Sequence, residues 1–337
     1  MSQVSVIIPT FNRSNLVCQT VANVLAQSLT PAEVIVVDDG STDDTLEQLN
    51  ERFGDAIQVI SQMNAGPGAA RNRGLEAARG DFIWLMDSDD LASLNQLECQ
   101  VDTLQREEAD IVYGPWARAY IDGQCVRLDG PVLQRDRTPS ERDELWWFVT
   151  NWSLVLQQCL FRAECLRRAG GYRTDIWSGE DGELFVRVLA HGAKVTFVHN
   201  TLTLYRLNDT GKLTASGVAA RRRTVDWAKC LLAIHDHCSN RPEIAAHPEY
   251  QRRLWQAYCD LIAHCPDESM LAERLRAHIH LDHRRLRVGC FVNRMRLGIR
   301  QRLRGHRWSP AYRPGPLTNV QRKLIEEMGL HLAELSQ

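Results

Sequence analysis

The 337-residue sequence lacks the short motifs that mark several common protein classes. Its ten cysteines include no C-x-x-C pair, which argues against a zinc site or a redox pair built on that motif. Neither G-x-x-x-x-G-K-[ST] nor G-x-G-x-x-G occurs, which argues against a P-loop enzyme and against a dinucleotide-dependent dehydrogenase. A nucleotide site in this chain must therefore rest on a different arrangement of residues.

Long apolar runs are missing as well. No stretch of about 18 uninterrupted apolar residues occurs, and the nearest approach, residues 145–161, is interrupted by polar side chains. Residues 1–9 lack the charged start and long apolar run of a signal peptide. Scattered cysteines are typical of buried thiols in a reducing compartment. The sequence therefore predicts no transmembrane helix and a cytoplasmic protein.

The net charge of −2 conceals an uneven distribution. Residues 1–212 hold 19 Lys and Arg against 30 Asp and Glu, a net charge of −11. Residues 213–337 hold 21 against 12, a net charge of +9. An acidic front suits a metal ion with its substrate, and a basic back suits an anionic partner.

The front of the chain alternates between strand and helix patterns. Buried strands are predicted at residues 4–8, 33–37, 57–61 and 81–85. Helices are predicted at residues 14–27, 69–79 and 94–106. This order predicts an α/β fold with a largely parallel sheet and helices on both faces. Ligands of such sheets bind beyond the carboxyl ends of the strands.

The predicted secondary structure of the rest of the chain changes twice. Strands are predicted at residues 111–113, 117–121, 156–161 and 195–198, with a hairpin turn at 122–123 and a helix at 180–190. Helical periodicity then dominates, at residues 218–238, 250–263, 271–280, 284–304 and 318–335. We expect a catalytic domain over residues 1–212 and a helical, basic region over residues 213–337.

Two polar clusters follow predicted strands. Residues 87–90, Asp-Ser-Asp-Asp, follow a strand, and hard oxygen ligands of this kind suit Mg²⁺ or Mn²⁺ together with a diphosphate. The alternative is a solvated acidic turn. Residues 38–43 place Asp39 where an acid can accept hydrogen bonds from a ribose or base. Ser41 or Asp43 of the same segment can cap the next helix, and this use does not compete with binding by Asp39.

Two further segments carry polar groups for the same cleft. Residues 64–74 combine glycines, which allow close backbone approach, with Arg71, which can hold a phosphate through two hydrogen bonds. The alternative is a flexible loop with a surface arginine. Residues 177–181 end in Glu180 and Asp181, where a carboxylate can act as a general base. The alternative, which has equal weight, is that these acids only stabilise the start of a helix through its dipole.

Together these motifs carry a resemblance. Residues 6–12, 36–43, 64–74, 86–90 and 179–181 follow the order found in family 2 glycosyltransferases, which have the GT-A fold. The resemblance covers about residues 2–210, and five ordered motifs are far more specific than each alone. The resemblance implies an inverting, metal-dependent, hexosyltransferase-type enzyme that takes a sugar from a nucleoside-diphosphate sugar, with UDP as the default nucleotide.

The resemblance also implies roles for individual residues. Asp181 is the implied base, supported by Glu180, and Asp89 with Asp87 is the implied site for Mg²⁺ or Mn²⁺. The implied nucleotide-sugar-binding residues are Pro9, Thr10, Asn12, Arg13, Asp39, Gly68, Arg71, Asp87, Ser88 and Arg206. Some family members have a metal-binding histidine where this chain has Arg206. Because a guanidinium cannot ligate a cation, Arg206 is expected to pair with the diphosphate instead.

The acceptor and the partners follow less directly. Trp146, Trp147, Trp152 and Trp177 bracket the expected acceptor side, where they either contact sugar rings and lipid chains or pack in the core. Nine arginines interleave with apolar residues over 284–307, as in a basic helix on an anionic membrane or one paired with the acidic front.

We expect a saccharide or lipid-linked acceptor in the synthesis of cell-surface polysaccharide or glycolipid. We also expect a cytoplasmic enzyme, either free or peripheral on the inner face of the membrane, and no nucleic-acid partner. The alternative function is a non-catalytic nucleotide-sugar-binding protein or membrane scaffold.

Overall fold

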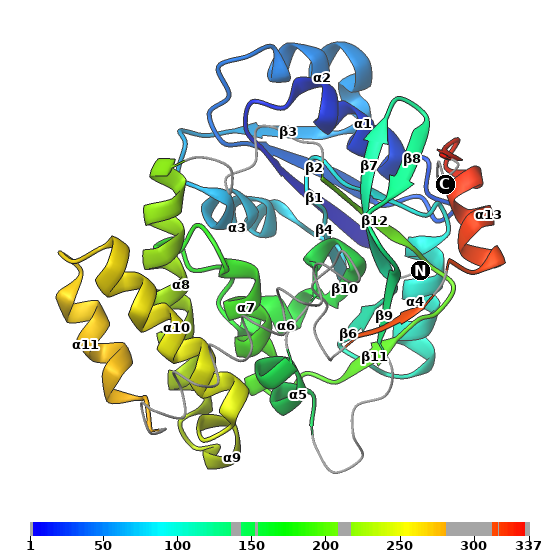
Figure 1. Ribbon diagram of the computed structural model, residues 1–337. Helices are drawn as coiled ribbons and strands as arrows, with labels where there is room; N and C mark the ends of the chain where they lie inside the picture. The colour runs from blue at the N-terminus through cyan, green and yellow to red at the C-terminus, as the bar shows by residue number, and fades with distance from the viewer. Residues whose placement is uncertain are drawn as a thin grey trace.

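The computed structural model describes residues 3–135, 143–151, 154–207, 217–280, 312–315 and 317–333 (Figure 1). Within this part of the chain, a main sheet of seven strands has the order β11-β6-β10-β4-β1-β2-β3. Its strands are β1 Val4–Thr10, β2 Glu33–Asp38, β3 Gln58–Ser61, β4 Phe82–Leu85, β6 Ile111–Tyr113, β10 Cys159–Arg162 and β11 Val195–Phe197. Strands β1 to β4 are mutually parallel, and β10 runs antiparallel to β4 and β6. The predicted, largely parallel sheet is confirmed.

Helices cover both faces of this sheet, as the alternation of strands and helices predicts. They are α1 Ser14–Leu25, α2 Thr45–Phe53, α3 Pro67–Ala77, α4 Gln96–Arg106, α5 Glu144–Asn151, α6 Ala163–Arg168 and α7 Glu180–Ala190. Successive strand residues point to opposite faces: Val6 packs with α1, α2 and α4, whereas its neighbour Ile7 packs with α3 and α7. Two apolar cores therefore sandwich the sheet, which holds its carboxyl edge rigid.

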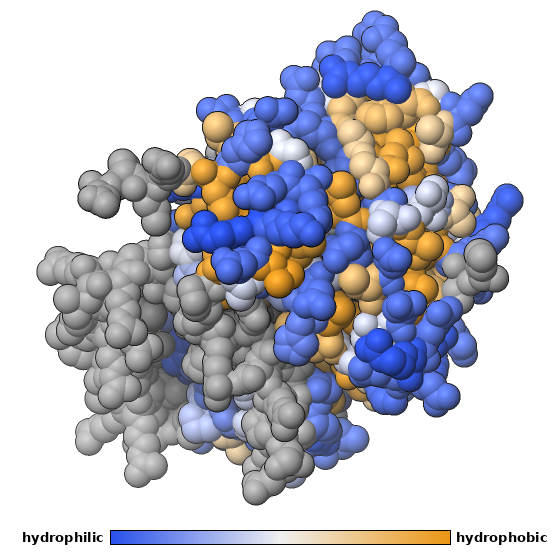
Figure 2. All heavy atoms as spheres, turned by 90° about the vertical axis from the view of Figure 1, so that its right-hand side faces the viewer, coloured by the Kyte–Doolittle hydropathy of each residue, from blue (hydrophilic) through white to orange (hydrophobic). Residues whose placement is uncertain are grey.

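A second, smaller sheet lies beside the first, on the right in Figure 1. Its strands are β5 Leu91–Ala92, β7 Trp116–Asp122, β8 Cys125–Leu128, β9 Val132–Arg135, β12 Thr203–Arg206, β13 Tyr312–Gly315 and β14 His331–Leu332. Helix α13, Asn319–Glu327, packs Leu324 and Ile325 against the apolar side of this sheet. Figure 2 shows this side of the molecule, where hydrophilic side chains separate several apolar areas.

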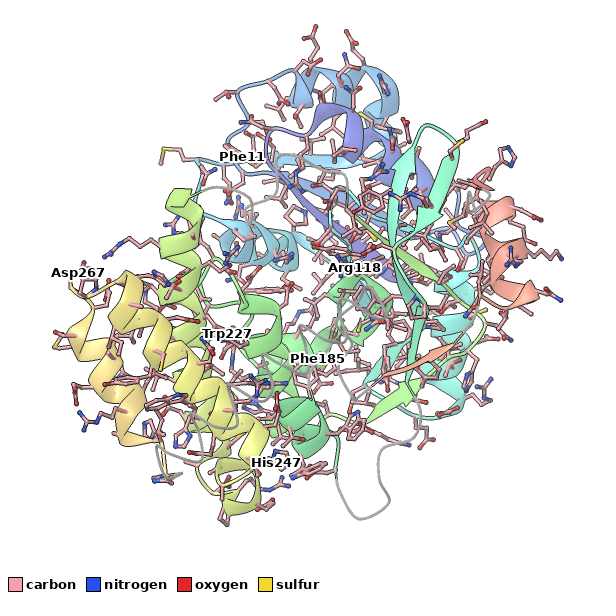
Figure 3. All side chains as sticks on the ribbon, in the orientation of Figure 1. Phe11, Arg118, Phe185, Trp227, His247 and Asp267 are labelled. Atoms are coloured by element: carbon pink, nitrogen blue, oxygen red, sulfur yellow. The ribbon has the colours of Figure 1, made fainter. Side chains whose placement is uncertain are left out.

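The helical region forms a layer on the opposite side of the molecule, at the left in Figure 1. Its helices are α8 Gly217–Cys238, α9 Pro242–Ala245, α10 Pro248–His264 and α11 Ser269–Ala277. Trp227 of α8 packs against the core that contains Phe185 of α7 (Figure 3). Helix α8 thereby joins the helical region to the helix that begins at Glu180. No helix in the described residues is both long and apolar enough to cross a membrane.

Several element predictions need correction. Residues 156–158 form a 3₁₀ turn (η2), and only 159–162 are a strand, because the backbone carbonyl of Gln157 accepts hydrogen bonds from Trp84 and Gln96. A second such turn, η1, spans Gly54–Ala56. The predicted helix 318–335 ends at Glu327, since Gly329 takes a positive φ of 72° and reverses the chain into β14.

Some predictions fall outside the described residues. They are the helix at 284–304 with its arginines, Trp152, and the domain boundary at 212–213. The division into domains 1–212 and 213–337 therefore stays a prediction. What the structure does show is that β13 and β14, from the end of the chain, pair with β9 and β8 of its front.

Candidate active site

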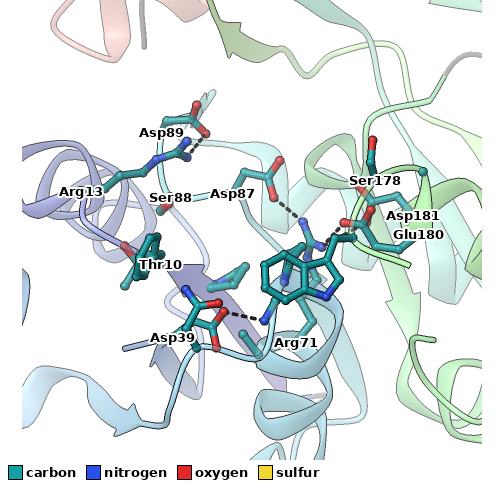
Figure 4. A pocket seen from close by; sticks show the side chains of 18 of the residues that line it. Thr10, Arg13, Asp39, Arg71, Asp87, Ser88, Asp89, Ser178, Glu180 and Asp181 are labelled. Atoms are coloured by element: carbon teal, nitrogen blue, oxygen red, sulfur yellow. Dashed lines mark hydrogen bonds and ion pairs between the residues drawn. The ribbon is translucent and has the colours of Figure 1, made fainter. Parts of the chain in front are cut away.

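A pocket of about 370 Å³ opens beyond the carboxyl ends of β1, β2 and β4 and is closed by the start of α7 (Figure 4). This volume lies within the range of small-molecule sites. The lining residues are Pro9, Thr10, Phe11, Arg13, Asp39, Asn64, Gly66, Pro67, Ala70, Arg71, Asp87, Ser88, Asp89, Trp177, Ser178, Gly179, Glu180, Asp181 and Tyr205. The predicted clusters at 38–43, 64–74, 87–90 and 177–181 therefore meet in one site.

Arg71 is the centre of the pocket's charges. Its guanidinium donates to Asp87 Oδ1 at 2.7 Å and to Glu180 Oε1 at 2.9 Å, and it lies 3.3 Å from Asp181 Oδ1. The ring of Tyr172, not singled out for this role from the sequence, lies 5.2 Å from the guanidinium carbon. Only 5% of the Arg71 side chain is exposed. One arginine therefore links the acidic motif of β4 to the acids of α7.

The two acids of α7 have different surroundings. The Glu180 side chain is 8% exposed, whereas the Asp181 side chain is 35% exposed and opens to the pocket. Burial, with the charge of Asp181, raises the pKa of Glu180 from 4.5 to about 8, although Arg71 opposes the shift. Burial also raises the pKa of Asp181; Arg71 counteracts this and Asp87 adds to it. Asp181 is thus the carboxyl group open to a ligand, and Glu180 is held on Arg71.

The acidic motif after β4 has the composition of a cation site. One carboxylate oxygen from each of Asp87, Asp89 and Asp90 lies within 4.8 Å of the others. Asp90 is fully buried and accepts hydrogen bonds from Gln157 Nε2 and from the backbone N–H of Arg206. Asp89 lies 3.5 Å from Arg13, and Asp87 is the most accessible of the three. Asp87 and Asp89 line the pocket, while Asp90 anchors the turn.

Asp39 shapes the glycine-containing loop. Its carboxylate accepts hydrogen bonds from the backbone N–H groups of Ala65 and Gly66 at 2.9 and 2.8 Å, and from Gln62 Nε2 at 2.7 Å. Gly66 has a φ of +93°, and a Cβ there would lie 2.5 Å from the Trp177 ring. Only glycine fits this close approach. The loop after β3 is therefore fixed between Asp39 and Trp177.

Three predicted binding residues lie outside the pocket lining. Asn12 joins the loops after β1 and β2, since its N–H donates to Ser41 Oγ and its Oδ1 accepts from the Thr42 N–H. Gly68 packs against the backbone of residue 173.

The third, Arg206, is 3% exposed and does not line the pocket. Its Nε donates to the carbonyl oxygen of Asp89 at 2.6 Å, and its guanidinium also donates to Gln19. This arrangement supports the backbone of the acidic motif from behind.

The remaining predicted residues all line the pocket: Pro9, Thr10, Arg13, Asp39, Arg71, Asp87, Ser88, Asp89, Glu180 and Asp181. Phe11 and Tyr205 also line it and were not predicted as binding residues, although Phe11 lies in the motif at residues 6–12 and Tyr205 precedes Arg206. The polar residues beside them in the sequence indicated the binding site. An aromatic side chain by itself does not show whether it lines a pocket or packs in the core.

The sequence of this chain is similar to a known protein family and to individual glycosyltransferases. Residues 5–168 match the family model described as glycosyl transferase family 2. An uncharacterized glycosyltransferase of Haemophilus influenzae is 34% identical over 131 residues, which cover 38% of this chain and 52% of that protein. The glycosyltransferase GlyG of Streptococcus pneumoniae is 27% identical over 218 residues, 60% of this chain and 70% of that protein.

Solved structures agree on the fold. TarS 1–349 of Staphylococcus aureus in complex with UDP has a TM-score of 0.51 at 19% identity, covering 82% of this chain and 87% of that one. The mannosyltransferase PcManGT of Pyrobaculum calidifontis, in complex with GDP-Man and Mn²⁺, has a TM-score of 0.52 at 17% identity, covering 91% and 88%. The expected GT-A fold is confirmed.

The match to the H. influenzae relative spans about half of that protein's length, so it bears on the shared domain. Within that domain, the family match, the fold and the order of the pocket motifs all agree. Residues 5–168 of this chain form a glycosyltransferase domain of family 2.

Proposed function

We propose that this chain is an inverting glycosyltransferase that moves a sugar from a nucleoside-diphosphate sugar to an acceptor hydroxyl. The observation that carries the proposal is the cluster around Arg71, which sets the accessible carboxyl group of Asp181 in the same pocket as Asp87 and Asp89. A candidate base and a candidate cation site that line one pocket suit a displacement at the anomeric carbon.

The predicted binding residues take the following roles in this proposal. Pro9, Thr10, Arg13 and Asp39 hold the nucleoside, and Ser88 lies beside the sugar phosphates. UDP is the nucleotide to test first, with GDP second, because related folds bind UDP and GDP-Man. Arg71 positions the carboxyl groups. Asn12, Gly68 and Arg206 act from outside the lining by shaping loops and supporting the acidic motif.

The chemical step is a single displacement. The acceptor oxygen attacks the anomeric carbon from the face opposite the nucleoside diphosphate, and the bond from this carbon to the phosphate oxygen breaks with its electron pair remaining on the diphosphate. Asp181 accepts the proton of the acceptor hydroxyl. Glu180 holds Arg71 and hence the orientation of Asp181. Because the attack is in line, the product has the inverted anomeric configuration.

A divalent cation fits the acidic motif. Asp87 and Asp89 offer hard oxygen donors at the pocket wall, which suit Mg²⁺ or Mn²⁺. When bound, the cation would neutralise charge on the leaving diphosphate. Asp89 is 3.5 Å from Arg13, so the arginine must share or release this carboxylate when a cation binds.

The acceptor and the cellular setting extend the proposal. We expect a saccharide or lipid-linked acceptor used in cell-surface polysaccharide or glycolipid synthesis. A cytoplasmic enzyme at the inner membrane face would meet such an acceptor, and the arginine-rich residues 284–307 would contact anionic lipid. Sedimentation with anionic and neutral vesicles, using the full chain, tests this part separately.

The test of function is donor turnover. The purified chain is incubated with a panel of UDP- and GDP-sugars and Mn²⁺ or Mg²⁺, with and without crude membrane lipid, and released nucleoside diphosphate is measured. We expect release from one donor and loss of release with EDTA. Product NMR reports the anomeric configuration, and retention would contradict the single displacement. A chain that binds none of these donors would contradict the proposed function.

A further inference from the structure

Trp177, a wall of the pocket, is held by helix α8, which lies beyond the residues that match the family model. The backbone N–H of Trp177 donates to Asp226 Oδ2 at 3.0 Å. Lys229 Nζ donates to the carbonyl oxygen of Asp175 at 3.2 Å, and Cys230 Sγ contacts the carbonyl oxygen of Gly179 at 3.3 Å. Helix α8 therefore holds the backbone at three alternate positions before Asp181, namely residues 175, 177 and 179.

Arg222, on the same helix, stacks on the Trp177 ring. Its guanidinium carbon lies 3.6 Å from the ring centroid, a distance at which the cation interacts with the face of the indole. In this geometry the N–H groups of the planar guanidinium project sideways and stay available for an anion. Trp177 cannot move away easily, because it lies against Gly66 as well.

Arg222 differs from Arg13 and Arg71 in forming no ion pair with a carboxylate of the described residues, although its charge opposes the rise that burial causes in the pKa of Asp226. Within the part of the chain that the structure describes, no carboxylate lies within ion-pair distance of its guanidinium and no hydrogen bond engages it, although its side chain is exposed. Its neighbour Arg221, by contrast, is paired with Asp267, which precedes α11 and is labelled in Figure 3. Among the described residues, the guanidinium is therefore held on Trp177 without a hydrogen-bonding partner.

The charges of the pocket explain what such a group can do. The lining contains five carboxyl groups and two guanidiniums. Arg71 is surrounded by Asp87, Glu180 and Asp181, and Arg13 lies beside Asp89. Because both lining arginines already face carboxylates, a further positive charge near the pocket would favour the binding of a ligand phosphate. Arg222 carries such a charge on the ring of Trp177, a residue of the lining.

We infer that Arg222, stacked on Trp177 and carried by α8, recognises a phosphate group of the ligand that occupies this pocket. The inference rests on the proposed function and names one element of its substrate chemistry. The phosphate has two sources, the diphosphate of the donor and a phosphate of the acceptor. Trp177 and Asp226 act as positioning residues, since they hold the guanidinium in place without contacting the phosphate.

Calorimetric titration with UDP, uridine, GDP and guanosine tests the donor as the source. Loss of a charge-assisted hydrogen bond weakens binding about tenfold or more. For Arg222→Ala we expect this loss for the nucleoside diphosphate and not for its nucleoside. Arg222→Lys keeps the charge without the planar stack, and its affinity for the nucleoside diphosphate should lie between those of wild type and Arg222→Ala. Arg276→Ala, which removes an exposed arginine from α11, is the matched control and should behave as wild type.

Inorganic phosphate tests the acceptor as the source. It is titrated into wild-type and Arg222→Ala protein, each saturated with the nucleoside diphosphate that binds. If wild type binds phosphate and Arg222→Ala does not, the acceptor is the source of the phosphate. Equal binding by the two proteins in both titrations, with equal melting temperatures, would overturn the inference and leave the proposed function intact. If wild type binds neither UDP nor GDP, the proposed function fails instead, and this inference with it.

Discussion

At the scale of single residues, the pocket shows how two adjacent carboxyl groups acquire different properties. Glu180 and Asp181 are consecutive, yet one is buried beside Arg71 and the other opens to the pocket. Burial raises the pKa of both, and that of Glu180 reaches about 8. Burial therefore disfavours the charged form of Glu180, and the more exposed Asp181 is the carboxyl group that an acceptor hydroxyl can reach.

This difference predicts opposite outcomes for two matched amide substitutions. Asp181→Asn removes the base and should lower kcat by about 10²–10⁴-fold. Glu180→Gln resembles the protonated form and should retain most of the activity, because a neutral side chain still occupies the site beside Arg71. Steady-state kinetics with the donor found in the panel measures both. Equal losses in the two variants would contradict the separate roles.

The same acids predict a pH dependence. Asp181 acts as a base only when it is unprotonated, and its pKa is raised above 3.8. The kcat/KM of the wild-type enzyme should therefore fall as the pH is lowered, beginning at a higher pH than for an ordinary aspartate. A pH–rate profile of wild type, with melting temperatures at each pH as the control for unfolding, checks this. A profile flat down to about pH 4 would show that Asp181 is not the base.

The sequence could identify most pocket residues because each follows a strand or begins a helix in a local motif. Asp39, Arg71, Asp87 and Asp181 were recognised in this way and do meet in the structure. The contribution of α8 could not be predicted. Asp226 stands 49 residues from the backbone group that it holds, and an acid within a helix gives no local sign of a distant partner.

At the scale of elements, the long strands and helices follow from hydrophobic pattern, whereas the shortest strands do not. The strand pattern at 4–8 was sufficient to predict β1, which has both faces buried. Strands β5 and β14 are two residues each and exist only through pairing with β12 and β8. Their formation depends on tertiary contacts, so no periodicity in the sequence could reveal them.

Helix α8 also carries a histidine whose surroundings disfavour its charge. His235 stacks 3.9 Å from His278 and faces Tyr250, with ring centroids 6.2 Å apart. Burial lowers the pKa of His235 below 6.5, and the charges of His278 and His280 act in the same direction, whereas Asp236 opposes them. A group with a lowered folded-state pKa stabilises the fold above the unfolded-state value, and this contribution is lost as the pH falls below 6.5.

The helical region should therefore lose stability in mild acid. We expect the free energy of unfolding in urea to be lower at about pH 5.5 than at about pH 8, and His235→Phe, which cannot be protonated, to show a smaller difference. The comparison is between the two pH values for each protein, so a general loss of stability in the variant does not obscure it. The same pH difference in both proteins would assign the effect to other groups.

At the scale of the whole molecule, the end of the chain returns to its front. Helix α13 lies against the second sheet, where Leu324 and Ile325 contact a core that includes Leu204 of β12. Strand β12 also carries Tyr205 of the pocket wall and Arg206, which supports the acidic motif. The C-terminal helix thus stabilises a sheet on which the pocket depends.

Substitution of one buried residue tests this dependence. Ile325 is fully buried, and Ile325→Ala should lower the free energy of unfolding by about 2–5 kcal/mol through lost contacts and a cavity. Val320 lies on the same helix but is 54% exposed, so Val320→Ala should change it by less than about 0.5 kcal/mol. Urea unfolding measures both. Because β12 reaches the pocket, the Ile325→Ala protein should bind the donor more weakly at urea concentrations close to its unfolding transition. The Val320→Ala protein should bind the donor normally at the same urea concentrations. If the two variants unfold alike, α13 does not stabilise the second sheet in solution.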